Sequence, residues 1–123
     1  MTIGQLESEI SKAVTQFERE HLGRGPRESR TYIIQDIILV RLKGVLTPAE
    51  EHLARSEDGA QLIKQLRMRL IESSRSLLEK IIEEKTKAKI LSLHTDISSK
   101  TGERVFVMIM SKDLEKIFTP KPR

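Results

Sequence analysis

Two polar residues in the C-terminal half, His94 and Asp96, have the types and the spacing that could support chemistry. They lie two positions apart in a segment that we predict to be a β-strand, so both side chains should point to one face of a sheet. A carboxylate there could orient an imidazole, or both groups could contact a metal ion. Metal centres normally use three or four ligands, and neither His21 nor His52 adds one at a useful spacing. We interpret the pair as a half-buried histidine and a turn-starting aspartate, and we predict no metal site.

Nucleophilic catalysis is not expected either. Ser73 or Ser74 could be combined with His94 and Asp96, but neither serine lies in the Gly-x-Ser-x-Gly elbow that exposes a nucleophile. The acidic pair Glu83-Glu84 follows apolar helical residues and is typical of a solvated surface. We therefore predict no catalytic residue, no cofactor and no enzymatic activity.

A glycine-rich segment, Gly23-Arg24-Gly25-Pro26, introduces a second group of candidate residues. It follows a predicted helix and precedes a predicted strand, the reverse of the order in which phosphate loops use helix amides. We interpret it as a helix stop and a hinge. The alternative is an anion or partner contact through Arg24 and Arg27. A small-ligand sensor would require Arg24, Arg27, Arg41, His94 and Asp96 to converge in one pocket.

Composition excludes several classes of protein. The 123 residues contain no cysteine, so disulfides, thiolate nucleophiles and cysteine metal sites are excluded. No uninterrupted apolar run approaches the ~20 residues of a membrane span, so we expect a cytoplasmic protein without membrane insertion. The 22 basic residues are interleaved with 18 acidic ones, aromatics are only 3%, and Trp is absent; nucleic acid is not an expected partner.

The N-terminal half alternates between helical and strand-like patterns. Apolar residues at steps of three and four predict an amphipathic helix over residues 5–21. Residues 31–42 are rich in β-branched side chains, and Gln35-Asp36 interrupts them, so we predict a hairpin there. Thr47, Pro48 and Glu50 predict a capping box, and a pause at residues 56–59 indicates two helices instead of one.

The C-terminal half is predicted to contain a long helix, a second hairpin and a short helix. The helix over residues 61–85 would be about 37 Å long, so part of it could form a homodimer interface. Strands over 89–96 and 103–110 would be joined by a polar turn, and a short helix over 111–118 would be capped by Ser111. The predicted fold is α+β, with a small antiparallel sheet of two hairpins packed against helices in the order αββααββα. One domain would span residues 5–118, with a frayed tail at 119–123.

Several motifs together resemble the bacterial MpsC-like family. They comprise Gly23-Arg24-Gly25-Pro26, Tyr32 to Asp36, Val40 to Glu50, Arg67, Ile71-Glu72, Ser74-Arg75, His94 to Ser98 and Thr101 to Glu103. The resemblance covers residues 5–110 and implies a cytoplasmic component of a sodium-translocating, membrane-potential-generating system associated with inorganic carbon supply. It implies no catalytic residues. Without a spanning segment, the chain would assist or regulate a membrane transporter subunit.

Three classes of function therefore compete. The first is a non-enzymatic accessory or regulatory module that binds a protein partner, as a homodimer, through the long helix or an exposed sheet edge. A large uncovered apolar surface would distinguish it. The second is the small-ligand or anion sensor described above. The third is an enzyme of unknown type, which would require His94 in a cleft beside further polar groups.

Overall fold

Four antiparallel strands form a single sheet in the computed structural model, which describes residues 1–120. The strands are β1 (Glu28–Ile34), β2 (Ile37–Lys43), β3 (Ile90–Ile97) and β4 (Arg104–Met110), in the spatial order β1-β2-β4-β3. Each hairpin pairs its own strands, and the β2–β4 pairing joins the two hairpins. The predicted α+β class and the single antiparallel sheet are confirmed.

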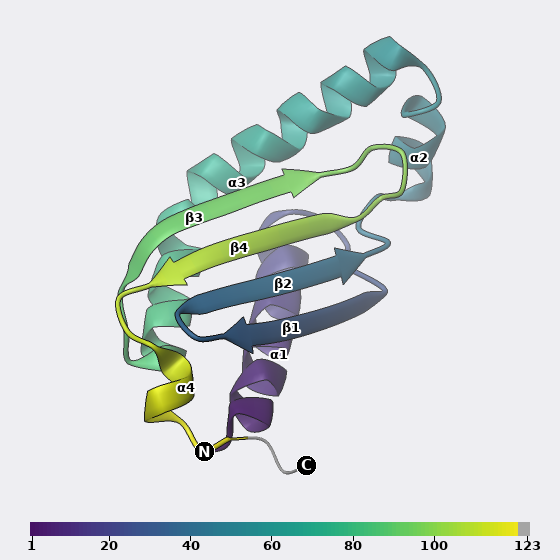
Figure 1. Ribbon diagram of the computed structural model, residues 1–123. Helices are drawn as coiled ribbons and strands as arrows, with labels where there is room; N and C mark the ends of the chain where they lie inside the picture. The colour runs from purple at the N-terminus through teal and green to yellow at the C-terminus, as the bar shows by residue number, and fades with distance from the viewer. Residues whose placement is uncertain (121–123) are drawn as a thin grey trace.

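The sheet buries one face and leaves the other open. Side chains alternate across each strand, so that Ile38, Val40 and Leu42 of β2 are fully buried while their neighbours are exposed or half-buried. On β4 the same alternation buries Arg104, Phe106, Met108 and Met110. Figure 1 shows α1 and α3 behind the sheet and no helix in front of it. The molecule therefore has two layers, with its core between the sheet and the helices.

Two helices cover the buried face of the sheet. Helix α1 (Ile3–His21) packs its apolar stripe against β1 and α3, burying Leu6, Ile10, Val14 and Phe17. Helix α3 (Glu57–Thr86) has 30 residues, which corresponds to about 45 Å. It crosses behind β3 and continues beyond the end of the sheet (Figure 1). The short α2 (Pro48–Leu53) and α4 (Leu114–Ile117) lie at opposite ends of the molecule.

The predicted capping and turn signals in the N-terminal half are largely confirmed. Thr47 and Glu50 form the expected capping box at the start of α2, and Ser56 caps α3 after the predicted pause. Gln35 adopts a left-handed conformation with φ 56° in the two-residue turn between β1 and β2. Helix α1 begins earlier than predicted because Thr2 and Gln5 form a second capping box.

Two expectations about the C-terminal part need correction. Ser111 does not cap the last helix, because its hydroxyl accepts a hydrogen bond from the backbone amide of Lys89; Asp113 caps α4 instead, and the helix has only four residues. Thr119, predicted to begin a frayed tail, pairs with Thr2 in a parallel bridge, and its carbonyl accepts a hydrogen bond from the Ile3 amide at 2.7 Å. Residues 121–123 of the predicted tail lie outside the described part of the chain.

Candidate functional site

Arg24 braces the glycine-rich loop against the segment after β2. Its Nη2 donates to the carbonyl oxygens of Leu46, at 2.6 Å, and Gly44, at 3.3 Å. Gly25 in the same loop has φ 87°, a conformation that favours glycine, and a Cβ atom there would lie 2.5 Å from Cγ of Arg19. The loop is thus a tightly packed crossing between α1 and β1, and the guanidinium of Arg24 is engaged by backbone carbonyls.

Arg27 and Arg41 occupy different surfaces. Arg27 lines an open cleft of about 500 Å³ beside the turn between β3 and β4. The other basic residues that line this cleft are Lys43, Arg55 and Lys100. Arg41 lies on the open face of the sheet, where its Nε donates to Oε2 of Glu103 at 2.6 Å. That hydrogen bond is the main cause of the raised pKa of Arg41.

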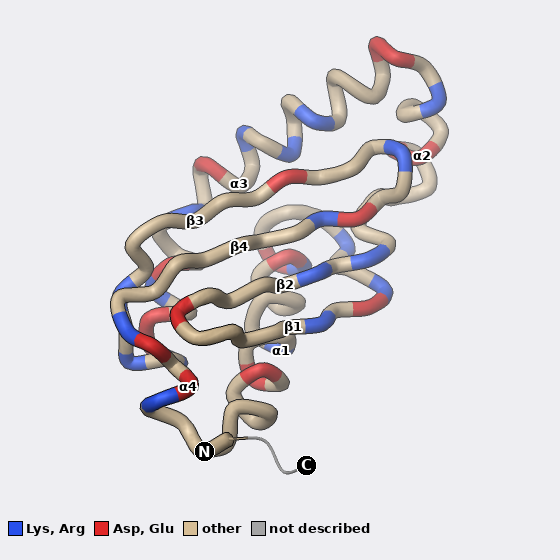
Figure 2. The backbone as a smooth tube through the Cα atoms, viewed as in Figure 1, with Lys and Arg blue, Asp and Glu red and all other residues tan. Residues whose placement is uncertain are grey.

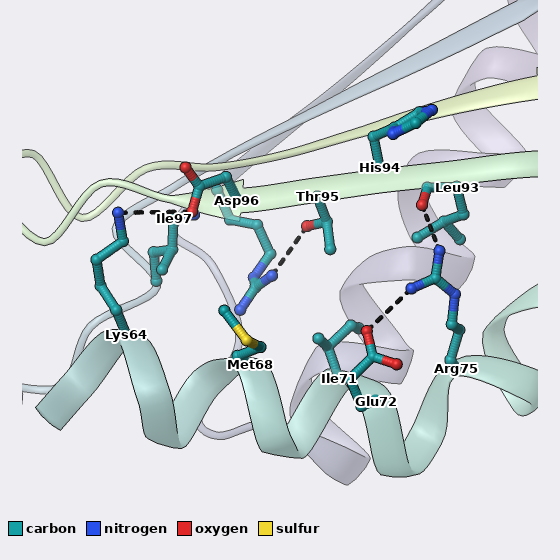
Figure 3. A pocket seen from close by; sticks show the side chains of 11 residues that line it. Lys64, Met68, Ile71, Glu72, Arg75, Leu93, His94, Thr95, Asp96 and Ile97 are labelled. Atoms are coloured by element: carbon teal, nitrogen blue, oxygen red, sulfur yellow. Dashed lines mark hydrogen bonds and ion pairs between the residues drawn. The ribbon is translucent and has the colours of Figure 1, made fainter. Parts of the chain in front are cut away.

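His94 and Asp96 share one face of β3, as their spacing predicts. Both are exposed and lie within β3, so the interpretation of His94 as half-buried and of Asp96 as the start of the turn is wrong. Figure 3 shows the imidazole of His94 on the side of the strand that faces away from α3. Asp96 lies 3.7 Å from Nζ of Lys64 on α3, and its Oδ1 accepts a hydrogen bond from the Ile97 amide. Within residues 1–120, no cluster of three or more His, Asp or Glu side chains has a geometry that could hold a metal ion. The structure thus places His94, Asp96 and Arg41 on the open face of the sheet, where Arg41 and Asp96 are both in register with Val105 of β4, and it places Arg24 and Arg27 elsewhere.

A cavity of about 310 Å³ lies between α3 and β3 (Figure 3). Helix α3 supplies Met68, Ile71 and Arg75 to its wall, among others, and β3 supplies residues 93–97. Arg75 crosses the gap, because its guanidinium donates to the carbonyl of Leu93 while it also pairs with Glu72 and Glu79. Arg104 of β4 lines the same cavity. The wall therefore combines an apolar part with three cationic side chains: Lys64, Arg75 and Arg104.

A layer of buried charge lies next to this cavity. Arg67 of α3 is 2% exposed and makes a two-pronged contact with Glu50, and it also donates to the carbonyls of Leu22 and Val45. Burial acts to raise the pKa of Glu50, but the hydrogen bonds from Arg67 and the Thr47 amide outweigh it and hold that pKa below its usual value. Arg67 thus joins α1, the β2–α2 connection, α2 and α3.

Glu18 and Arg104 form the second half of this layer, and both are 1% exposed. Burial raises the pKa of Glu18, although the charges of Arg104 and Arg67 act in the opposite direction. Burial likewise lowers the pKa of Arg104, against the opposing charge of Glu18. Arg104 donates from Nη1 to the hydroxyl of Thr95 at 2.9 Å. Nε and Nη2 of Arg104 have no hydrogen-bond partner among residues 1–120. Oε2 of Glu18 has none within these residues either.

Sequence reasoning missed the roles of Arg67 and Arg104, although each leaves a recognisable signal. Arg67 interrupts the buried stripe of α3 between Ile63 and Ile71, at steps of four residues. Arg104 begins the inward-facing series that continues with Phe106 on β4. A single arginine at an inward position of an apolar period marks a buried guanidinium that requires acceptors.

No helix within residues 1–120 has both the length and the apolar character needed to cross a bilayer. The fold and the cavity define the class of the chain: an α+β protein with one open sheet face and a cavity between α3 and β3 that carries cationic side chains. The residues that were predicted to form a ligand site do not converge in one pocket. The family model described as "Na+-translocating membrane potential-generating system (MpsC)" matches residues 2–112. The chain belongs to this MpsC family, as its motifs predict.

Two proteins of Bacillus subtilis (strain 168) are similar over most of their length. YbcI, described as uncharacterized, is 50% identical over 113 residues, which is 92% of this chain and 91% of YbcI. YrhF, also described as uncharacterized, is 24% identical over 109 residues, or 88% of this chain and 89% of YrhF. No solved structure matches the chain significantly.

Proposed function

We propose that this chain is a non-enzymatic, cytoplasmic accessory subunit of a sodium-translocating, membrane-potential-generating system, and that it acts as a homodimer. Membership of the MpsC family supports the connection with such a system. The observation that carries the proposal is the open face of the sheet. A contact surface of this kind suits a subunit that works by binding other proteins.

One half of the open face is apolar. Tyr32 and Ile34 of β1 are 40% and 54% exposed, and the outward side chains of the central strands are half-buried: Ile37, Leu39, Val105, Val107 and Ile109. The uncovered face of an antiparallel sheet ordinarily carries polar side chains. Within the four strands the charged residues lie toward one end of the sheet, as Figure 2 shows, and the apolar residues named above lie toward the other end. A contiguous apolar surface of this kind marks a contact with another protein.

A second copy of the chain is the occupant that fits this face. A two-fold axis along the strands would place apolar half against apolar half and charged end against charged end. That end contains both signs, because Arg30 and Arg41 lie beside Glu28 and Glu103. Each cation could therefore face a carboxylate of the other copy. Four strands of about seven residues cover roughly 19 by 24 Å, which places the contact near the lower bound of stable interfaces.

Analytical ultracentrifugation tests the homodimer. We expect a concentration-dependent dimer for the wild type and a monomer for Val107→Lys, because the lysine charge would lie in the centre of the apolar contact. Leu66→Lys is the matched control, since Leu66 is 50% exposed on α3, away from the open face. A wild type that stays monomeric, or a Val107→Lys variant that dimerises like the control, would refute the sheet-face interface. Circular dichroism melts establish that both variants fold.

The connection with sodium translocation needs a test in cells. In a strain that lacks this chain, we expect a potential-sensitive dye to report a reduced sodium-dependent membrane potential. Wild type and Leu66→Lys should restore the potential, whereas Val107→Lys should not. A potential that does not change when the chain is removed would refute the accessory role, irrespective of the oligomeric state.

A further inference from the structure

The open cleft beside the turn between β3 and β4 brings together four segments that are far apart in the sequence. These are the start of β1, the end of β2 with the residues after it, α2 with the residues after it, and the turn itself. Figure 2 shows basic positions at the end of β2 and in this turn, at the end of the sheet where α2 lies. The volume of the cleft, about 500 Å³, lies within the range of ligand pockets.

The wall of the cleft carries more positive than negative charge. Its charged side chains are four cations and two carboxylates, which leaves a net charge of +2: Arg27, Lys43, Arg55, Lys100, Glu28 and Glu51. Lys43 lies 4.0 Å from Glu28. Within residues 1–120, no carboxylate lies within 4.0 Å of the side-chain nitrogens of Arg27, Arg55 or Lys100. Cations that line one cleft without counter-charges favour the binding of an anion there.

The stem of Arg27 is held in place at this cleft by Gly44. A Cβ atom at Gly44 would lie 2.9 Å from both Cγ and Cδ of Arg27, so a side chain there would have to displace the stem. The amide of Arg27 donates to the Lys43 carbonyl at 2.9 Å, whereas its guanidinium has no acceptor within residues 1–120. Arg24 in the same loop is engaged by two carbonyls and is not available. Arg27 is therefore positioned by the fold with its donors free for a ligand.

The chemistry of the wall indicates the class of the ligand. A guanidinium binds phosphate oxygens through two parallel hydrogen bonds, and a phosphate monoester carries nearly two negative charges at neutral pH, which matches the net charge of the wall. The two carboxylates of the wall can accept hydrogen bonds from hydroxyl groups. Leu46 is the single large apolar side chain among the lining residues, and none of them is aromatic, so a nucleobase would have nothing to stack on.

From this arrangement we propose that the cleft binds a phosphate monoester of a polyhydroxy compound, such as a sugar phosphate. The phosphate is bound by Arg27, Arg55 and Lys100, and the hydroxyl groups donate to Glu28 and Glu51. A phospholipid headgroup shares part of this chemistry, but it is a phosphodiester with one charge on its phosphate, and it would leave one positive charge of the wall unmatched.

Nuclear magnetic resonance titration with glucose 6-phosphate tests the proposal. We expect the amide signals of residues 99–102 to shift saturably, with a Kd of roughly 1 mM or lower. Glucose should produce no saturable shift, because it lacks the phosphate. Sulfate at matched ionic strength should bind about tenfold more weakly, because it has no hydroxyl group to donate to the carboxylates. An absent response to glucose 6-phosphate, or an equal response to glucose or sulfate, would overturn the proposal.

Two variants locate the binding in the cleft. Arg55→Ala and Lys100→Ala should each weaken the binding of glucose 6-phosphate by about tenfold, because each removes one charged donor. Arg69→Ala is the matched control, since it removes the same charge at an exposed position of α3 that does not line the cleft. Affinities equal to that of the control would place the ligand elsewhere and overturn the proposal. Arg55 and Lys100 lie outside the four strands, so neither variant should affect dimer formation, and the two proposals can fail separately.

Sedimentation with vesicles separates a free phosphate ester from a membrane surface. With vesicles of phosphatidylglycerol and phosphatidylcholine at about 0.15 M salt, we expect the chain to remain in the supernatant. Pelleting with these vesicles that Arg55→Ala abolishes and Arg69→Ala does not would assign the cleft to lipid headgroups and overturn the proposal.

Discussion

Arg67 and Glu50 meet through two parallel hydrogen bonds, from Nε to Oε2 at 3.0 Å and from Nη2 to Oε1 at 2.5 Å. The same Glu50 accepts the amide of Thr47 at the start of α2. One carboxylate thus completes a helix cap and neutralises a buried guanidinium. Its loss would affect both the local helix and the packing of the helices around Arg67.

Glu50→Gln should separate these two roles, because glutamine can still complete the capping box but carries no charge. We expect a loss of about 2–3 kcal/mol in the free energy of unfolding, since the variant leaves a buried arginine without its counter-charge. Urea denaturation measures this loss. Glu51→Gln, at an exposed position of the same helix, is the control and should cost less than about 0.5 kcal/mol. Equal losses in the two variants would show that the ion pair contributes nothing beyond the cap.

Glu18 should give stability a distinctive dependence on pH. Because burial raises its pKa in the folded state above the ordinary 4.5, the folded chain retains a proton that the unfolded chain releases. The stabilisation is therefore fully present below about pH 4.5 and is lost as the pH rises through the folded pKa. Glu18→Gln removes this titration, so the wild-type stability minus the variant stability should fall as the pH increases above 4.5.

The measurement is a series of urea unfolding curves between acidic and neutral pH for both proteins. Glu20→Gln, at an exposed position of α1, controls for the loss of one charge from the helix. A difference between wild type and Glu18→Gln that grows with increasing pH would contradict the assigned direction. Glu50 has the opposite sign, because its lowered pKa provides stability that is lost as the pH falls through its folded value.

Lys87 ends α3 in a left-handed conformation with φ 59°. Only glycine adopts this conformation without a steric penalty, so Lys87→Gly should stabilise the chain by roughly 0.5–1 kcal/mol. Lys85→Gly, within the last turn of the same helix, should instead destabilise it by about 1 kcal/mol. Thermal unfolding of the two variants should therefore shift in opposite directions. A shift in the same direction for both would contradict the proposed origin of the effect.

Gly59 lies in the first turn of α3, where alanine would ordinarily favour the helix. A Cβ atom at this position would lie 1.9 Å from the carbonyl oxygen of Leu53, far inside any contact distance. Gly59→Ala should therefore lower the free energy of unfolding by about 2 kcal/mol or more, because the backbone between α2 and α3 has to move. Ala60→Gly, the adjacent control, should cost only about 1 kcal/mol. A neutral Gly59→Ala would show that this turn opens without strain.

Local signals in the sequence were sufficient for most of the fold. The β-branched run around Gln35-Asp36 predicted the first hairpin, and Thr47 with Glu50 predicted the start of α2, because both signals act between residues close in the chain. Ser111 was misassigned as a cap since Asp113 has equivalent chemistry two residues later. The hydroxyl of Ser111 accepts a hydrogen bond from the Lys89 amide where the adjacent strands β3 and β4 meet, 22 residues apart in the sequence, and no local pattern reveals this contact.

The candidate site was less accessible to sequence reasoning. The shared face of His94 and Asp96 follows from strand periodicity and is confirmed. The environment of Arg104 depends on α1, α3 and β3 meeting at one place. In the sequence, a charged residue within an apolar period looks like the end of the buried series and not like a buried member of it. Which donors of a guanidinium find acceptors is decided by these tertiary contacts, which leave no local pattern in the sequence.

The bridge between Thr2 and Thr119 brings the two ends of the described chain together at the end of the molecule where α4 lies (Figure 1). The turn at residues 98–103, between β3 and β4, lies at the opposite end. A short linker across the bridge and new termini in that turn would therefore yield a circular permutant with the same sheet order. In such a molecule β4 would come first and β3 last. The β3–β4 pairing would then have to form between the two ends of the chain instead of within a hairpin, which should slow folding while leaving the final architecture unchanged.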